Sequence, residues 1–307
     1  MDTSPFHADE LTAQLLASVE PAGAGIRGHM PDQHRAFFAS LSYLVVTTPD
    51  GDGWPVATML FGAPGFVSAP DVTTLRIECM PGLSDPVLEA FMPGQEVGVL
   101  GLDLATRRRN RANGYIIGRD AFGMTTEIHQ SFGNCPQYIQ RRSVHPAVRA
   151  GGATEPLTAL DDEALALIEV ADTFFVASRS RWGRAEQGGA DISHRGGQPG
   201  FVRVDGETLL IPDFRGNHYF NTLGNFLGEP RGALLFIDFE RGDLLQLQGQ
   251  VEIDWSDSAA REIEGAERCW RFRVARGYRR RSALPLRWSL VDQAPTTKNT
   301  GIWRRDQ

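Results

Sequence analysis

The sequence predicts a mainly β fold: two tandem β-barrels with a few short helices within one chain. Three observations lead to this prediction. Short β-rich runs alternate with turns rich in Gly, Pro and Asp, which is typical of a small antiparallel barrel. One such pattern occurs twice in the chain. The length of 307 residues independently suggests two domains.

The two copies keep the same anchors at nearly constant spacing. Pro64-Gly65-Phe66 aligns with Pro199-Gly200-Phe201, and Asn113-Gly114 aligns with Gln248-Gly249. A repeat unit of this length exceeds a solenoid repeat, so we interpret it as one small domain present twice. Positions where the copies differ in polarity should mark the functional site, because packing requirements would have kept them alike. The matching segments are 42–67 with 172–202, 73–77 with 207–211, and 97–104 with 232–239.

The first half begins with a leader over residues 1–30, in which the apolar spacing predicts a helix over 10–19. A short helix over 33–41 should cap the first barrel, which we place at residues 31–150. Strands are predicted in YLVVTT, VATMLF, GFVSA, TLRIEC, VGVLGLDL and NGYIIG. A short helix is expected over 85–91, between two of these strands.

A linker with the sequence AGGATEPLTALDD leads into the second half, which we place at residues 158–295. A helix begins near its start, with either Thr158 or Asp161 as the N-cap. Strands return in TFFVAS, ADISHR, GFVRV, TLLIP, GALLFIDF and LLQLQGQVEI, and a helix is expected between TLLIP and GALLFIDF. Residues 262–276 form either a helix or a strand, and LPLRWSLV closes the repeat.

Composition argues against several classes of function. The formal net charge of -7 disfavours a nucleic-acid partner, and the basic runs 107–109 and 279–281 are expected to be solvated strand ends or turns. Neither a signal peptide nor a membrane-spanning run is recognisable, so we expect a cytoplasmic protein without a membrane partner. The three cysteines are scattered, which predicts no metal site. Walker A, G-x-S-x-G and H-E-x-x-H motifs are absent from the sequence.

Polar residues are concentrated in the second copy, in ADISHRGG and IPDFRGNHYFNTLGN, where the first copy reads VATMLFGA and ECMPGLSDP. An arginine beside Gly and Asn ahead of a helix suits a phosphate, because guanidinium groups bind oxyanions bidentately and helix N-termini present free N–H groups. A structural ion-pair network among Arg195, Asp213 and Arg215 is the alternative. The candidate binding residues of this copy are Ser193, His194, Arg195, Asp213, Arg215, Gly216, Asn217, Asn221 and Asn225.

The first half contributes the polar segment 132–150. If the halves pack as a pseudo-dimer, this segment could cover a ligand at their junction; a structured connector is the alternative. Its residues Asn134, Gln137 and Tyr138 offer donors and acceptors that suit a heteroaromatic ring. We single out His194 and Tyr138 as the candidate catalytic residues, without assigning an acid or a base.

The motifs GQPGFVRV, TLLIPDFRGNHYFNTLGNFLGEPRGALLFIDF, TRRRNRANG and FGNCPQYIQRR resemble those of the pyridoxamine 5′-phosphate oxidase-like, FMN-binding split-barrel family. The similarity is to the long form with two fused barrels and covers residues 30–290. It implies two tandem FMN-binding split β-barrels that form an intramolecular pseudo-dimer, with FMN at the junction. By position, the resemblance implies that the FMN phosphate and ribityl chain lie near Ser193, Arg195, Arg215 and Asn217. It implies that the turn is supported, or the flavin contacted, by Asn221 and Asn225.

The resemblance implies an FMN-dependent flavoprotein oxidoreductase that acts on a small-molecule substrate. Its electron donor would be NAD(P)H or a separate reductase, and further homodimerisation is possible. The alternatives are a non-catalytic flavin or haem carrier, a B6-phosphate oxidase or deazaflavin-dependent reductase, and a scaffold without a cofactor. The basic residues that hold the substrate phosphate in pyridoxamine phosphate oxidases are not evident, which counts against vitamin B6 oxidation.

Overall fold

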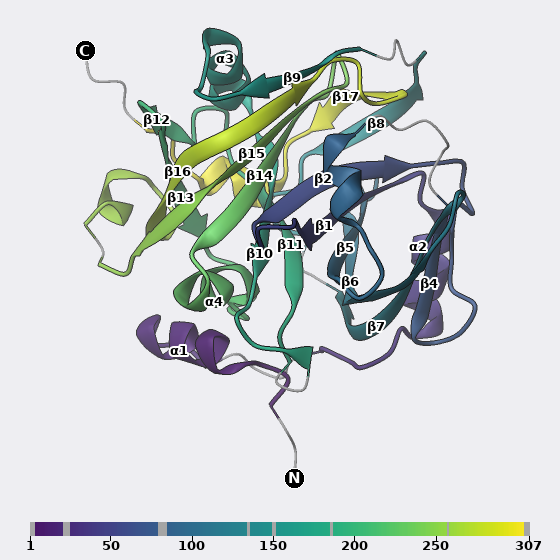
Figure 1. Cartoon of the computed structure of the whole chain (residues 1–307). Helices are drawn as coiled ribbons and strands as arrows, with labels where there is room; N and C mark the ends of the chain where they lie inside the picture. Colours follow the sequence, from purple (N-terminus) through teal and green to yellow (C-terminus); the bar gives the residue numbers. More distant parts are fainter. Residues whose placement is uncertain are drawn as a thin grey trace.

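The computed structural model describes residues 4–20, 25–78, 85–133, 136–148, 152–184, 187–256 and 258–303. Over these ranges the protein is mainly β and contains two large antiparallel sheets (Figure 1). The first sheet consists of β1 Tyr43–Pro49, β2 Pro55–Phe61, β3 Val67–Ser68, β4 Thr74–Glu78, β5 Glu96–Asp103, β6 Arg108–Arg119 and β7 Gly123–Gly133. The second consists of β9 Thr154–Leu157, β10 Thr173–Arg179, β11 Ala190–Gly196, β12 Arg203–Asp205, β13 Thr208–Phe214, β14 Arg231–Asp238, β15 Asp243–Asp254 and β16 Ala266–Arg280.

The two sheets have the same strand order, which shows the internal duplication directly. The first reads β2-β1-β5-β6-β7-β4-β3 and the second reads β11-β10-β14-β15-β16-β13-β12. In the second sheet β9 adds one more strand by pairing with β16. The prediction of a mainly β fold built from two tandem copies is therefore confirmed.

The helices differ between the copies more than the strands do. Each first long strand follows a helix, α2 Asp32–Ser40 in one half and α3 Asp162–Val170 in the other. The Asp161 carboxylate accepts from the Ala164 N–H at 2.9 Å, so Asp161 is the N-cap of α3. Ahead of β5 lies a short 3-10 helix, Pro86–Ala90, whereas α4 Asn221–Gly228 occupies the matching connection ahead of β14.

Each half has its own hydrophobic core, and a third apolar cluster joins the halves. Phe38 lies in the first core and Trp270 in the second. The third cluster contains Tyr43, Phe175 and Trp288, with other side chains from the outer faces of strands in both halves. Burial of this apolar surface stabilises the association of the two halves.

The contact between the halves is reciprocal. Strand β5 of the first half packs on β11 of the second, and β14 of the second half packs on β2 of the first. Because β5 corresponds to β14 and β2 to β11, the two contacts are equivalent. Such reciprocity is the property of a two-fold interface. The protein is thus an intramolecular pseudo-dimer, as predicted.

One open alternative is decided, and two local predictions need correction. Residues 262–276 form most of the strand β16 Ala266–Arg280, in which Trp270 and Phe272 are buried at alternate positions. The run LPLRWSLV forms β17 Leu286–Asp292, but it pairs with β8 Arg141–Pro146 in a separate two-stranded sheet. Part of the predicted linker is β9.

The basic run 279–281 is not a solvated turn. Arg280 is buried against Asp85 of the first half, and the almost buried Arg279 contacts the carboxylates of Glu155, Asp161 and Glu163. The domain limits 31–150 and 158–295 stay predictions. Within the described ranges, no helix is long and apolar enough to cross a lipid bilayer.

Candidate functional site

A polar pocket lies between the two halves, where β6 of the first meets β11 and α4 of the second. Its empty volume is about 580 Å³. The described residues that line it include four arginines, Arg109, Arg111, Arg195 and Arg268, and one acidic residue, Asp213. We call it the arginine pocket. The excess of positive charge suits an anion.

Helix α4 begins at this pocket. Its N-cap, Phe220, adopts a left-handed conformation with φ 59° and ψ 25°, and no side chain caps the helix. Phe220, Asn221 and Thr222 line the pocket. The first N–H groups of a helix have no partner within the helix and carry partial positive charge. The start of α4 therefore adds to the attraction for an anion.

Arg111 is the most constrained of the four arginines and is 4% exposed. Its Nη1 lies 2.9 Å from Asp191 Oδ1 and donates to Asn221 Oδ1 at 3.2 Å. Its Nη2 donates to Ser193 Oγ at 2.6 Å. The Nε–H is buried and has no hydrogen-bond partner among the described residues. A buried donor without a partner is costly, so it marks a place where a ligand atom would be stabilised.

Asp213 links two other arginines of the pocket. Its carboxylate lies 3.2 Å from Arg195 and accepts from Arg268 at 2.5 Å. The ion pair that we considered as an alternative is thus present between Arg195 and Asp213. Arg268 also lies 3.3 Å from Glu267, so two carboxylates balance the charge of these two guanidinium groups.

A second pocket, with an empty volume of about 450 Å³, adjoins the arginine pocket and shares Arg109, His194 and Arg195 with it. We call it the aromatic pocket, because Tyr138 and Phe214 line it with ring centroids 5.6 Å apart. Among the described residues that line it, the buried polar atoms without a hydrogen-bond partner include Gln137 Oε1, His194 Nε2 and Arg195 Nε.

His194 is neutral at physiological pH. Burial lowers the pKa of His194 well below its usual value, and the nearby charges of Arg109, Arg142 and Arg195 lower it further. Its ring packs edge-on against Phe175. A neutral imidazole in this position offers one nitrogen to the pocket as a donor or an acceptor, depending on its tautomer.

The structure brings most of the predicted residues to these two pockets. Predicted residues that line the arginine pocket are Ser193, His194, Arg195, Asp213, Gly216, Asn217 and Asn221. Gln137 and Tyr138 line the aromatic pocket. Asn134 lies outside the described residues, so its predicted role stays a prediction.

Two predicted residues lie elsewhere. Arg215 is exposed and lines neither pocket; its carbonyl oxygen accepts from the Tyr138 hydroxyl. Asn225 is buried, but it bonds to His7 and Ser178 and does not line either pocket. The predicted contacts of Arg215 and Asn225 with a cofactor have no support in these positions.

Sequence reasoning missed Arg109, Arg111 and Arg268. Arg109 and Arg111 are two positions apart on β6, and residues at that spacing share one face of a strand. This alternation was the available signal, but it was read as part of a solvated run. Arg268 is paired with Asp213 across β13 and β16, and nothing local in the sequence predicts that register.

The pseudo-symmetry defines a second position, related to the arginine pocket by exchange of the halves. There Gln246 replaces Arg111, and Thr58 replaces Ser193. Asp85 fills the position: it accepts from the Thr58 hydroxyl, from Gln246 and, at 2.6 Å, from Arg280. This second position therefore contains an internal ion pair.

Comparison with known proteins adds little to this geometry. No family model matches the chain, and no curated protein matches it. HupZ from Group A Streptococcus is 17% identical over 39% of this chain and 93% of its own, with a TM-score of 0.31. A candidate pyridoxamine 5′-phosphate oxidase from Lactobacillus delbrueckii is 13% identical over 34% of this chain and 94% of its own, with a TM-score of 0.27.

A candidate 5-nitroimidazole antibiotic resistance protein from Bacteroides thetaiotaomicron is also similar. It is 11% identical over 45% of this chain and 94% of its own, with a TM-score of 0.27. Likenesses at these TM-scores carry no argument about function. The functional proposal therefore depends on the pockets.

Proposed function

We propose that the chain is an FMN-binding oxidoreductase that acts on a small-molecule substrate. The FMN phosphate would bind in the arginine pocket and the ring system in the adjoining aromatic pocket. The observation that carries the proposal is the junction of these two pockets: an arginine-rich one at the start of a helix, beside one lined by aromatic rings. FMN consists of a phosphate group joined to a heteroaromatic ring system, so its two parts match the two pockets.

Buried polar atoms without partners support the fit. They include Arg111 Nε of a residue that lines the arginine pocket, and Gln137 Oε1 and His194 Nε2 of residues that line the aromatic pocket. A flavin ring carries both donors and acceptors at its edge. Binding would satisfy groups that the protein alone leaves unsatisfied, which favours a polar heteroaromatic ligand over an apolar one.

The redox chemistry would come from the flavin, while the protein would supply binding and orientation. Arg195 and Arg268 would hold the phosphate, with Asp213 keeping both guanidinium groups in place. Gln137 and His194 would orient the ring edge. Because His194 is neutral, it would not add a positive charge beside the ring.

The first test is the absorption spectrum of the purified protein, with mass spectrometry of whatever heat releases. Flavin bands and the mass of FMN are expected. A Soret band would instead indicate a haem carrier. A colourless protein that also fails to bind added FMN would contradict the proposal.

A charge deletion tests where the phosphate binds. Arg195→Ala is expected to weaken FMN binding by about tenfold or more, since a hydrogen bond to a charged group contributes roughly 1.5–3 kcal/mol. Riboflavin, which lacks the phosphate, should bind the variant and the wild type alike. Fluorescence quenching measures both dissociation constants. Equal losses for FMN and riboflavin would show that Arg195 does not contact the phosphate.

Two further variants complete this test. Arg241→Ala removes an exposed arginine away from both pockets and should change neither constant. Arg215→Ala tests whether Arg215 contacts the phosphate. The sequence-based prediction is a similar tenfold loss of FMN affinity, whereas the exposed position of Arg215 predicts little change in FMN affinity.

We also expect one FMN per chain, because the position related by pseudo-symmetry contains the Asp85–Arg280 ion pair. Isothermal titration calorimetry should give a stoichiometry of about one. Two equivalents per chain would show that the ion pair opens to admit a second ligand.

A further inference from the structure

Helix α1, Ala8–Leu16, buries its polar side and exposes its apolar side. Asp9, Glu10 and Gln14 are buried, whereas Leu11 and Leu15 are 39% and 78% exposed. A surface helix usually has the opposite arrangement. Burial of apolar side chains therefore contributes little to holding α1 in place, and specific polar contacts must hold it instead.

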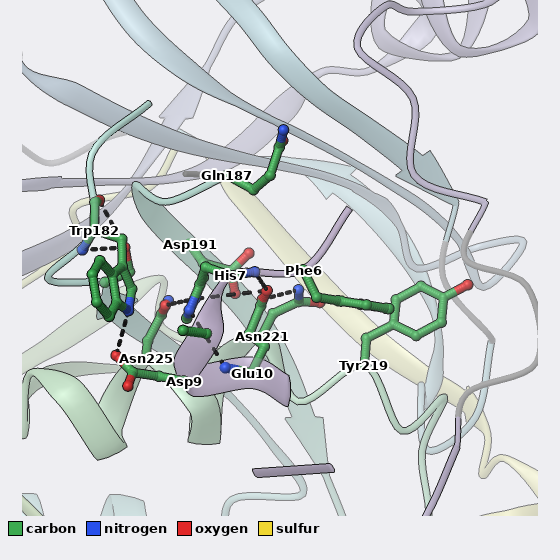
Figure 2. Close-up of polar contacts among 12 residues, drawn as sticks. Phe6, His7, Asp9, Glu10, Trp182, Gln187, Asp191, Tyr219, Asn221 and Asn225 are labelled. Atoms are coloured by element: carbon green, nitrogen blue, oxygen red, sulfur yellow. Dashed lines mark hydrogen bonds and ion pairs between the residues drawn. The ribbon is translucent and has the colours of Figure 1, made fainter. Parts of the chain in front are cut away.

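The polar contacts of α1 are made with α4, beside the arginine pocket (Figure 2). Glu10 accepts a hydrogen bond from Asn221 Nδ2 at 2.5 Å, and the Nε2 atom of His7 lies 2.8 Å from Asn225 Oδ1. The Glu10 carboxylate also accepts from the His7 N–H at 3.0 Å, which closes a capping box. Both asparagines were predicted to serve a cofactor. Both bond to the N-terminal segment, and Asn221 also lines the arginine pocket.

Glycine residues on α4 allow this close approach. A Cβ atom on Gly224 would lie 2.6 Å from the Cα of Glu10, and one on Gly228 would lie 2.2 Å from an Asp9 carboxylate oxygen. Any larger residue at Gly224 would push the backbone of α1 away. Asp9 meanwhile accepts from Arg181 and, at 2.7 Å, from the Trp182 indole N–H.

A chain of hydrogen bonds runs from α1 into the arginine pocket. Glu10 accepts from the Nδ2 group of Asn221, and the Oδ1 atom of the same amide accepts from Arg111. Because Glu10 takes the hydrogen bond of the Asn221 Nδ2 group, the Oδ1 side of the amide is left facing Arg111. Arg111 in turn lines the pocket, and its buried Nε–H has no partner among the described residues.

We propose that α1 is an integral part of the anion site, in which Glu10 acts as a positioning residue that orients Arg111 through Asn221. The inference rests on the proposed phosphate site. It assigns a binding role to a segment that the sequence indicates only as a leader. Removing the contact between Glu10 and Asn221 should loosen Arg111 and weaken the binding of a phosphate group.

The ionisation of Glu10 gives this arrangement a pH dependence. Burial raises the pKa of Glu10 to about 8, so its carboxyl group is neutral at pH 7. The groups that face it are Asn221 on α4, Asp191 on β11, Arg111 on β6 and His7, whose own pKa is lowered by burial. Above pH 8 an ionised Glu10 would add negative charge near Arg111 and oppose a phosphate dianion.

The test compares dissociation constants for FMN at pH 7 and pH 9, where a phosphate monoester stays a dianion. Glu10→Ala should weaken binding about tenfold at pH 7. Wild-type affinity should fall between the two pH values. Glu10→Gln removes the ionisable group and should lose the fall in affinity between pH 7 and pH 9. Glu20→Ala, at an exposed carboxylate in the same leader, is the matched control.

A second variant displaces α1 without altering Glu10, Asn221 or Arg111. Gly224→Ala should weaken FMN binding in the same direction, because its methyl group would meet the backbone of Glu10. Gly51→Ala, where a Cβ atom meets nothing within 4 Å, is the control. Circular dichroism confirms that each variant folds. Wild-type affinity in both folded Glu10→Ala and Gly224→Ala would overturn the inference.

Inorganic pyrophosphate separates this inference from the proposed function. It is expected to raise the melting temperature of the wild type and to raise that of Glu10→Ala less. If pyrophosphate behaves this way while FMN does not bind, the role of α1 stands and the FMN proposal fails. If pyrophosphate stabilises both proteins equally, or neither of them, the inference fails.

Discussion

Replacing Arg280 with methionine is expected to lower the free energy of unfolding by about 3–5 kcal/mol, because it leaves the Asp85 carboxylate buried without its cation. The two side chains are 5% and 2% exposed and lie 2.6 Å apart. Thr58 and Gln246 also donate to Asp85, but neither carries a charge. Urea denaturation of the wild type and of Arg280→Met measures the difference.

Two variants identify the cause of this loss. Arg35→Met breaks the pair with Asp32, also 2.6 Å apart, but Asp32 is almost fully exposed, so the loss should be below about 1 kcal/mol. Adding Asp85→Asn to Arg280→Met removes the uncompensated charge and should restore part of the stability. A loss for Arg280→Met no larger than that for Arg35→Met would contradict the prediction.

Glu10→Gln is expected to gain stability relative to the wild type as the pH rises from 4.5 to 8. The pKa of Glu10 is about 8 in the folded protein, against 4.5 for the unperturbed group. Between these values the folded state binds a proton that the unfolded state has lost. Wild-type stability should therefore fall as pH rises through this window, by up to about 5 kcal/mol at 1.4 kcal/mol per pH unit.

The difference in unfolding free energy between the variant and the wild type, measured by urea denaturation from pH 4.5 to 8, tests this. Subtraction cancels the titration of groups that behave alike in both proteins. Glu20→Gln makes the same change at an exposed carboxylate and should give a flat difference curve. A flat curve for Glu10→Gln as well would show that Glu10 titrates normally.

The fold could be predicted from the sequence because its signals are local or repeated. Alternating strands and turns, and anchors such as Pro64-Gly65-Phe66 with Pro199-Gly200-Phe201, indicated two copies of a β domain. The run 262–276 remained ambiguous, because its apolar spacing suits a helix or a strand. Its pairing with β13 and β15, far away in the sequence, decides in favour of the strand.

The site could be predicted only in part, for a related reason. His194 and Arg195 stand out because the first copy has the apolar residues Met59 and Leu60 at the equivalent positions. The arginines on β6 reach the site only through packing between the halves, and Glu10 reaches it through packing of α1 on α4. Arg215 was favoured by its neighbours in the sequence, yet it is exposed. Local composition therefore indicated the region of the candidate site, but packing between distant segments determines which side chains line it.

The covalent fusion of the two halves has a consequence for how this protein could change over time. In a dimer of identical chains, every substitution appears in both symmetry-related positions at once. Here the positions of Arg111 and Gln246 are encoded separately, as are those of Ser193 and Thr58. The arginine pocket can therefore keep charged side chains for a ligand, while mutations at the pseudo-symmetric position produce an internal ion pair, here Asp85–Arg280.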